Sequence, residues 1–243
     1  MKLSKEMFIQ KTKESFEKIG LNIAEDKLEK LYLYKELLIE WNEKINLTAI
    51  TDDEEIIQKH FVDSAYALKV IENGSSIIDV GTGAGLPGMV LAICNDSYKV
   101  TLLDALQKRV VFLNEVITKL GLKNTIAVHS RAEEAGRQEE FREKYDIVIS
   151  RAVASLNILM ELTTPFVKVN GYCIYMKADK LQEEMKGSKN AEKQLNLKLD
   201  NIKEYDINLT DSVLQHNLAI YLKTEKLPEK YPRQFAKIKK NPL

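Results

Sequence analysis

Residues 76–88 of this sequence read SIIDVGTGAGLPG, and this stretch decides the fold. Its first residues are apolar and β-branched, as in a buried strand, and a turn rich in glycine follows Asp79 and Val80. Leu86-Pro87 then opens an apolar stretch, and proline suits the first turn of a helix. Because a strand, a glycine turn and a helix start can present backbone amides to a ligand, the stretch predicts a site for a nucleotide or nucleoside cofactor.

The composition of the whole chain limits its class. Of 243 residues 44% are hydrophobic, and 36 Lys and Arg balance 36 Asp and Glu, so a nucleic-acid partner would need a local basic patch. Cys94 and Cys173 lie in apolar surroundings, which is typical of free thiols in a reducing compartment. No apolar run approaches the ~20 residues of a membrane span, so we expect a soluble, cytoplasmic protein with no membrane partner.

The patterns of apolar and charged residues divide the chain into three predicted segments. Residues 1–71 carry apolar residues at three- and four-residue steps, which predicts an N-terminal helical extension. Residues 72–224 alternate strand and helix patterns, which predicts an α/β domain with a mostly parallel sheet and a late antiparallel strand. Residues 225–243 form a basic C-terminal tail, with six Lys or Arg against two Glu.

The expected elements place the ligand site at one edge of the sheet. We expect strands at 76–80, 99–103, 125–129, 145–150, 171–176 and 217–223, and helices at 107–120 and 156–166. Residues 178–200 are charged and rich in lysine, which favours a surface helix and loop. In an open sheet of this kind, ligands bind beyond the carboxyl ends of the parallel strands.

The glycine turn is compatible with two kinds of cofactor. Residues 83–88 match G-x-G-x-x-G, and Asp104 follows about 20 residues later, as in dinucleotide sites. Asp79, however, would repel a pyrophosphate and favour the cationic sulfonium and ammonium groups of S-adenosylmethionine. The glycines also read G-x-G-x-G from residue 81, and Glu133 adds an acid after the third strand, where adenine could be bound. Together, these signals favour S-adenosylmethionine, with Asp104 on the ribose.

Each of these acids also has a structural explanation. Asp79 could cap the turn that follows it, and Asp104 could cap the next helix, because Asp is favoured at helix N-caps. Glu133 could be an ordinary surface carboxylate. A nicotinamide-dependent oxidoreductase and a ligand-binding module without catalysis are therefore alternative functions.

Five motifs give the sequence a resemblance to a known family. They are WNEKINLT at 41–48, HFVDS at 60–64, DVGTGAGLPG at 79–88, LDALQKR at 103–109 and SRA at 150–152. In this order they resemble the bacterial guanine-N7 methyltransferases of small-subunit ribosomal RNA, also called the glucose-inhibited division protein B family. The resemblance runs from about Lys27 to Lys177 and continues weakly into the tail.

The resemblance carries expectations about fold, substrate and site. It implies a Rossmann-like class I S-adenosylmethionine-dependent methyltransferase fold, with residues 72–224 as the methyltransferase domain. It implies methylation of guanine N7 in a conserved loop of 16S ribosomal RNA, taken as free RNA or in the small ribosomal subunit. Carried over by motif, the cofactor contacts fall on Gly81, Leu86, Ala132, Glu133 and Arg151; the predicted pocket adds Asp79, Gly83 and Asp104.

The expected reaction needs little from catalytic side chains. Guanine N7 has an in-plane lone pair and no proton at neutral pH, so its attack on a sulfonium methyl requires no general base. We therefore expect neither a catalytic acid–base residue nor a metal ion. Alignment of the reacting atoms and electrostatic complementarity would provide the rate enhancement.

RNA contacts must come from local groups in a chain of zero net charge. Arg151 is the candidate contact to the guanine edge or a phosphate; alternatively it is a salt-bridge partner of Asp79 or Glu133. Arg131 is a second candidate RNA contact, with a surface salt bridge as its alternative. The basic tail and the lysines within 177–193 could form a positive face, or they could be solvated runs of charge.

Overall fold

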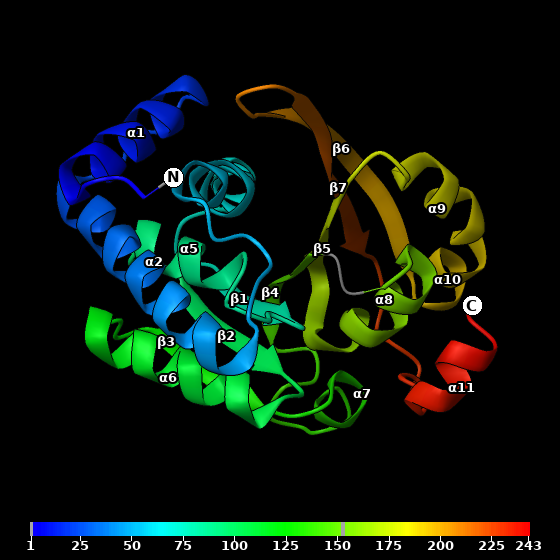
Figure 1. Cartoon of the computed structure of the whole chain (residues 1–243). Coiled ribbons are helices and arrows are strands. Elements are labelled where there is room, and N and C mark those ends of the chain that lie inside the picture. The colour runs from blue at the N-terminus through cyan, green and yellow to red at the C-terminus, as the bar shows by residue number, and fades with distance from the viewer. Residues whose placement is uncertain (1, 152–153) are drawn as a thin grey trace.

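The computed structural model describes residues 2–151 and 154–243 and is built around one seven-stranded sheet (Figure 1). The strand order is β3-β2-β1-β4-β5-β7-β6. The strands are β1 (Ser76–Val80), β2 (Lys99–Asp104), β3 (Thr125–His129), β4 (Tyr145–Arg151), β5 (Val167–Lys177), β6 (Leu197–Asn208) and β7 (Val213–Lys223). From β1 the sheet grows first toward β2 and β3 and then, on the other side, toward β4 and β5, so the strand order reverses between β1 and β4. Such a switch point forms a ligand-binding crevice in open α/β sheets.

The pairing confirms the expected α/β class. Strands β1 to β5 pair in parallel, β7 pairs antiparallel with β5, and β6 pairs antiparallel with β7. The late antiparallel strand is therefore confirmed, and it begins at Val213 rather than Asn217. In parallel strands the register aligns the carboxyl ends, and Asp104 of β2 lies opposite His129 of β3.

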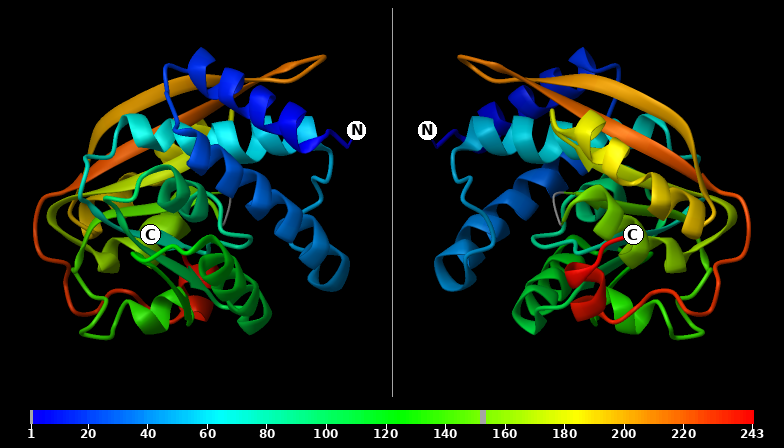
Figure 2. Two further views of the ribbon diagram at one scale, coloured as in Figure 1. Left: turned by 90° about the vertical axis from the view of Figure 1, so that its left-hand side faces the viewer. Right: turned by 90° about the vertical axis from the view of Figure 1, so that its right-hand side faces the viewer.

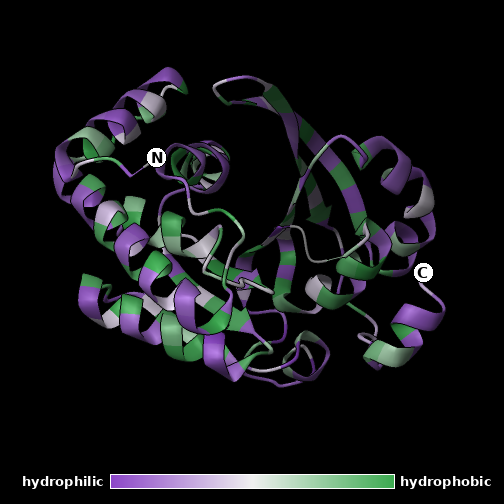
Figure 3. Cartoon of the chain, in the orientation of Figure 1, coloured by the Kyte–Doolittle hydropathy of each residue, from purple (hydrophilic) through white to green (hydrophobic). Residues whose placement is uncertain are grey.

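Strand β6 was not expected from the sequence. The predicted surface helix is present as α9 (Leu181–Gly187) and α10 (Lys189–Gln194), but the predicted loop from Leu197 onward is wrong. Strand β6 alternates hydrophilic and hydrophobic residues along much of its length (Figure 3), because one of its faces meets solvent, whereas β7 is buried on both faces from Asn217 to Tyr221. The charged residues at the exposed positions of β6 made its sequence resemble a surface loop rather than a strand.

The N-terminal helices share a hydrophobic core with one face of the sheet (Figures 1 and 2). Phe8, Tyr34 and Phe61 of these helices belong to the same buried cluster as Leu102 and Phe112. The helices on this side are α1 (Lys5–Lys18), α2 (Glu25–Ile45), α3 (Asp53–Glu55), the π-helix η1 (Ile56–Val62), α4 (Asp63–Ala65), the 3₁₀ helix η2 (Tyr66–Lys69), α5 (Gly88–Cys94) and α6 (Gln107–Leu120). The division at residue 71 stays a prediction from sequence, because this core crosses it.

The opposite face is covered by the later helices and the tail. A second buried cluster joins β1, β4 and β5 to α8 (Leu156–Thr163), and η3 (Thr164–Phe166) extends that helix to the expected end. The remaining helices are α7 (Ala132–Ala135) and α11 (Phe235–Lys240). In residues 2–151 and 154–243, every helix falls short of the length and apolarity needed to cross a bilayer.

A buried ion pair holds the tail against α8. Glu161 is fully buried and accepts bonds from the backbone N, Nε and Nη2 of Arg233 at 2.9, 2.8 and 2.5 Å. Arg142 adds a bond to the carbonyl of Tyr231 at 2.9 Å. The tail is therefore fixed up to Arg233, and α11 beyond it exposes three lysines, Lys237, Lys239 and Lys240.

Tyr34 of α2 connects the N-terminal helices to the glycine turn. It is fully buried, its ring stacks on Phe61 with 5.8 Å between centroids, and its hydroxyl donates to the carbonyl of Ala84 at 2.6 Å. Because Ala84 is itself buried, this bond satisfies a turn carbonyl that water does not reach.

We predict that Tyr34→Phe lowers the free energy of unfolding by about 1–3 kcal/mol, because it leaves the Ala84 carbonyl buried without a donor. Urea denaturation followed by circular dichroism would measure the loss. Tyr172→Phe is the matched control, since the Tyr172 hydroxyl has no bonding partner in the described part of the chain. Equal losses in the two variants would contradict the role given to the Tyr34 hydroxyl.

Candidate functional site

The glycine turn between β1 and α5 is built on left-handed backbone. Gly81, Gly83 and Gly85 have φ of 73°, 61° and 98°, values that residues with a Cβ adopt only under strain. Gly88 starts α5 where a Cβ would lie 2.4 Å from Leu102 Cδ2. The expected helix therefore begins one residue after Pro87, which is its N-cap and follows a cis peptide bond.

Most backbone amides of the turn donate to acceptors within the protein; that of Ala84 has no acceptor among the described residues. Those of Gly81 and Thr82 donate to the carbonyl of Leu103 at 2.9 and 3.1 Å, and those of Gly85 and Leu86 donate to the carbonyl of Thr82 at 2.9 and 3.0 Å. The expectation of free amides for a ligand is therefore wrong at these positions. Among the described residues no donor reaches the carbonyl oxygen of Gly81, so the turn offers an acceptor instead.

Asp79 lies beneath the turn and is fully buried. Its Oδ2 accepts bonds from the Gly88 amide at 2.8 Å and the Thr82 hydroxyl at 2.6 Å, so the structural explanation of Asp79 as a cap is confirmed. Its Oδ1 has no bonding partner among the described residues. Burial raises the pKa of Asp79 to about 6, although both bonds and the charge of Arg151 oppose this. The site thus contains a desolvated carboxylate with one unsatisfied oxygen.

Asp104 at the end of β2 stabilises the same turn through hydrogen bonds. Its Oδ2 accepts the amide of Gly83 at 2.9 Å and the Nη1 of Arg109 at 3.3 Å, and its Oδ1 accepts the amide of Leu106 at 2.8 Å. Leu106 is the N-cap of α6, so Asp104 orders the residues before that helix rather than capping it. A role of Asp104 in binding ribose stays a prediction.

The predicted adenine-binding residues follow β3 at the same sheet edge. Ala132 and Glu133 open α7, and the side chain of Glu133 is only 14% exposed, unlike an ordinary surface carboxylate. Arg131 is 60% exposed, with its Nη1 4.0 Å from Oε1 of Glu133. Glu133 therefore faces a sheltered space, while Arg131 stands on the surface.

Arg151 ends β4, and neither of its expected salt-bridge partners is the observed one. Its Nη1 donates to Oδ2 of Asp63 at 2.6 Å and to the carbonyl of Lys59 at 3.0 Å, so the prediction of Asp79 or Glu133 as partner is wrong. Its Nε and Nη2 have no partner in residues 2–151 and 154–243. Two donor groups of Arg151 thus remain for a ligand.

Asp63 is a functional candidate that reasoning from single residues missed. Its side chain is 2% exposed, and its Oδ1 accepts the Tyr205 hydroxyl and meets Nδ1 of His216, both at 2.8 Å. Nearby His60 bonds Thr48 Oγ1 through Nε2 at 3.0 Å, and burial lowers the pKa of His60 to about 4. The only signal in the sequence was the position of Asp63 in the motif HFVDS, residues 60–64.

A groove of about 780 Å³ lies beyond the ends of β4 and β5, and Pro242 of the tail lines its rim. Lys177 lines it but is only 7% exposed, and its Nζ donates to the Ala154 carbonyl at 2.6 Å and to Glu184 at 2.8 Å. Of the two alternatives for the lysines within 177–193, neither holds at Lys177, because its charge is buried and paired rather than part of a positive face or a solvated run.

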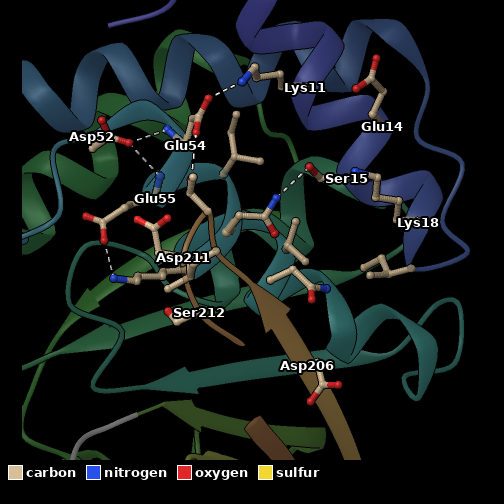
Figure 4. Close-up of a pocket in the computed structure, with 18 residues that line it drawn as sticks. Lys11, Glu14, Ser15, Lys18, Asp52, Glu54, Glu55, Asp206, Asp211 and Ser212 are labelled. Atoms are coloured by element: carbon tan, nitrogen blue, oxygen red, sulfur yellow. Dashed lines mark hydrogen bonds and ion pairs between the residues drawn. The ribbon is translucent and has the colours of Figure 1, made fainter. Parts of the chain in front are cut away.

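A second hollow, of about 700 Å³, separates α1 and η1 from the tip of the β6–β7 hairpin (Figure 4). Thr210 at the tip donates to Glu54 at 3.5 Å, and Gln58 donates to Ser15 at 2.9 Å. Lys11 also pairs with Glu54. The residues of this hollow were not predicted as site residues; they hold the hairpin tip beside the N-terminal helices.

We predict that Asp79→Asn becomes more stable relative to the original chain as the pH rises. The folded state raises the pKa of Asp79 to about 6, so folding binds a proton between about pH 4 and 6, and the stability of the original chain falls across that range. Asn does not titrate, so the difference between the two chains should grow by up to about 3 kcal/mol from pH 4 to pH 8.

Denaturation at a series of pH values would measure this change. Asp211→Asn is the matched control, because it replaces the same group at an exposed position. A difference between the original chain and Asp79→Asn that stays constant from pH 4 to pH 8 would contradict the prediction.

Comparison with known proteins gives the fold and the family. Residues 27–213 match the family described as rRNA small subunit methyltransferase G. The chain is 50% identical over 233 residues to the ribosomal RNA small subunit methyltransferase G of Clostridium perfringens, which covers 95% of this chain and 97% of that one. It is 48% identical over 225 residues to the protein of the same name from Acetivibrio thermocellus, covering 92% of each.

Solved structures share the fold at low identity. The crystal structure of M. jannaschii TYW2 in complex with AdoMet has a TM-score of 0.52 and 20% identity, over 67% of this chain and 76% of that one. A SAM-dependent methyltransferase from Aquifex aeolicus has a TM-score of 0.52 and 18% identity, over 76% of this chain and 97% of that one. The expected class I fold is confirmed, and the full-length similarity in sequence shows that the chain belongs to the rRNA small subunit methyltransferase G family.

Proposed function

We propose that this chain transfers the methyl group of S-adenosylmethionine to N7 of a guanine in 16S ribosomal RNA. The observation that carries the proposal is the family match over residues 27–213, which contains the glycine turn and every predicted site residue. Membership of the family confirms the expected class of enzyme, a methyltransferase. Because ribosomal RNA is found in the cytoplasm of bacteria, we propose a cytoplasmic location for this chain.

The polarity of the glycine turn supports a cationic cofactor. A pyrophosphate would need free amide donors, but the turn uses those of Gly81, Thr82, Gly85 and Leu86 internally. An ammonium group instead needs an acceptor and a negative potential; the Gly81 carbonyl would supply the first, and the buried charge of Asp79 beneath the turn the second. This disfavours the nicotinamide dinucleotide that the match to G-x-G-x-x-G had allowed.

The remaining cofactor contacts are assigned by position. We infer that Gly81, Gly83 and Leu86 line the methionine part, while Asp104, Ala132 and Glu133 take the ribose and adenine. Gly81, Gly83 and Leu86 follow β1, Asp104 ends β2, and Ala132 and Glu133 follow β3, all at one edge of the sheet. When bound, S-adenosylmethionine supplies an electrophilic methyl group carried on a sulfonium.

The protein has to orient the base rather than move a proton. N7 of guanine attacks through its own lone pair, so an arginine must leave N7 free and can contact only O6 or a phosphate. The Nε and Nη2 of Arg151, which have no partner among the described residues, suit such a contact. Alignment of this kind is worth roughly 7–11 kcal/mol of the barrier in well-oriented reactions.

RNA binding is assigned to local groups near the groove. The lysines of α11 are exposed, Pro242 just beyond them lines the groove, and Arg131 is exposed at the same sheet edge. We propose that these cations contact phosphates of the RNA, as free 16S RNA or within the small subunit. Affinity should then fall steeply with salt.

We predict that Gly81→Val abolishes binding of S-adenosylhomocysteine measured by calorimetry. Valine strains a backbone at φ 73° and fills the space beside the Gly81 carbonyl. Gly121→Val is the control: it imposes the same strain at φ 62°, but at the end of α6, away from the site. Loss of binding in both variants would show that backbone strain, rather than the position of Gly81 in the pocket, causes the effect. Unchanged affinity in folded Gly81→Val would contradict the assignment of Gly81 to the cofactor pocket.

The activity itself is tested with tritiated S-adenosylmethionine and three substrates: naked 16S RNA, small subunits and assembly intermediates. We expect incorporation into at least one of them. Reduction with borohydride followed by aniline should then cleave the RNA at a single 7-methylguanosine. Incorporation at any atom other than guanine N7, or no incorporation into all three substrates, would contradict the proposed function.

A further inference from the structure

We propose that Asp63 is a positioning residue for methyl transfer, which fixes the guanidinium of Arg151 at the reaction site and neutralises its charge. The inference rests on the proposed function and adds to it a residue outside the expected site. Asp63 opens α4 in the N-terminal helices, whereas Arg151 ends β4 in the sheet.

The orientation of Arg151 is set from outside its own strand. Both side-chain bonds that Arg151 makes to described residues go to the N-terminal segment, to Oδ2 of Asp63 at 2.6 Å and to the carbonyl of Lys59 at 3.0 Å. Asp79 pairs with Ile149 across β1 and β4, so Arg151 lies two residues further along, level with the glycine turn. The N-terminal helices thus hold an arginine directly beside the predicted methionine part of the pocket.

The two oxygens of Asp63 have separate partners. Oδ1 is taken by Tyr205 and His216 of the β6–β7 hairpin, both at 2.8 Å, which leaves Oδ2 to Arg151. Tyr205 is itself held by a stacked contact with Tyr66, with 3.9 Å between ring centroids. A carboxylate fixed by these groups cannot rotate away from the guanidinium, so Nη1 is anchored and Nε and Nη2 keep one direction.

The charge of the reaction explains why Arg151 needs a buried carboxylate. The sulfonium donor and the N7-methylguanine product are both cationic, so the positive charge is present throughout methyl transfer. A bare guanidinium beside them would repel both, most strongly where water is excluded. The charge of Asp63 offsets that of Arg151, so the arginine can donate hydrogen bonds without opposing the reaction.

An ordinary structural ion pair would have the same contacts but different consequences. Breaking it would lower stability, and the folded enzyme would keep its activity. The chain offers a matched control in Glu143, which pairs with the fully buried Lys223 at 2.6 Å and lies before the start of β4, at the opposite edge of the sheet. Glu143→Gln therefore removes a comparable charge pair away from the site.

The first test compares Asp63→Asn with Glu143→Gln below their melting temperatures. We expect Asp63→Asn to lower kcat/KM for rRNA methylation by about tenfold to 100-fold, the size of effect that misplacement of a reacting group produces. Glu143→Gln should lose stability only. The proposal is overturned if folded Asp63→Asn matches the original chain in kcat/KM.

Chemical rescue provides the sharper readout. Guanidinium ion at millimolar concentration should restore part of the activity of Arg151→Ala, because Asp63 would bind and orient it. It should not restore the double variant Asp63→Asn, Arg151→Ala, and that double variant should be no slower than Arg151→Ala alone. Equal rescue in both backgrounds would show that Asp63 does not position the guanidinium.

A measurement without RNA separates this proposal from the proposed function. Nitrogen-15 NMR of the arginine side chains should show the guanidinium signals of Arg151, identified by their loss in Arg151→Lys, as those of an immobilised group. Asp63→Asn should broaden them, and unchanged signals would overturn the positioning role. If the original chain methylates no rRNA, the proposed function fails, and the NMR result still decides whether Asp63 orients Arg151.

Discussion

The buried carboxylate of Asp79 is the interaction on which the site depends. By accepting the Gly88 amide at 2.8 Å and the Thr82 hydroxyl at 2.6 Å, it ties the start of α5 and the glycine turn to the end of β1. Burial disfavours its charge, so the fold bears an electrostatic cost at this point. Such a cost is typical of positions kept for binding or catalysis. In the turn that results, five amides are bonded internally, those of Gly81, Thr82, Gly83, Gly85 and Leu86, and the Gly81 carbonyl has no donor among the described residues.

Most of the sheet could be predicted from sequence, because its central strands are buried on both faces. Runs such as residues 76–80 and 145–150 are apolar and β-branched, and their burial in a parallel sheet matches that composition. Strand β6 could not be found in the same way. It lies in a hairpin at the sheet edge with one face in solvent, so its charged residues resemble those of a surface loop. Pairing with β7, rather than local preference, decides its conformation.

The positions of the site residues were predictable, but their partners were not. Asp79, Asp104 and Arg151 stand at or near the ends of parallel strands, and a parallel sheet aligns such ends at one edge. Arg151 is paired with Asp63, 88 residues earlier, and one partner of Asp104 is the Gly83 amide, 21 residues earlier. No periodicity encodes such contacts, because they arise only when the N-terminal helices and the turn pack on the sheet.

These contacts give the N-terminal extension a structural role at the site. Tyr34 of α2 bonds the glycine turn, and Asp63 of α4 holds Arg151, so two helices before residue 71 support both sides of the pocket. The β6–β7 hairpin closes the arrangement from a third side, since Tyr205 and His216 occupy the other oxygen of Asp63. The proposed transfer uses no general base and would depend on alignment and electrostatic complementarity, and this frame holds the turn and Arg151 in place for both. The predicted boundary near residue 71 therefore separates two patterns of sequence, while the proposed chemistry would require both parts together.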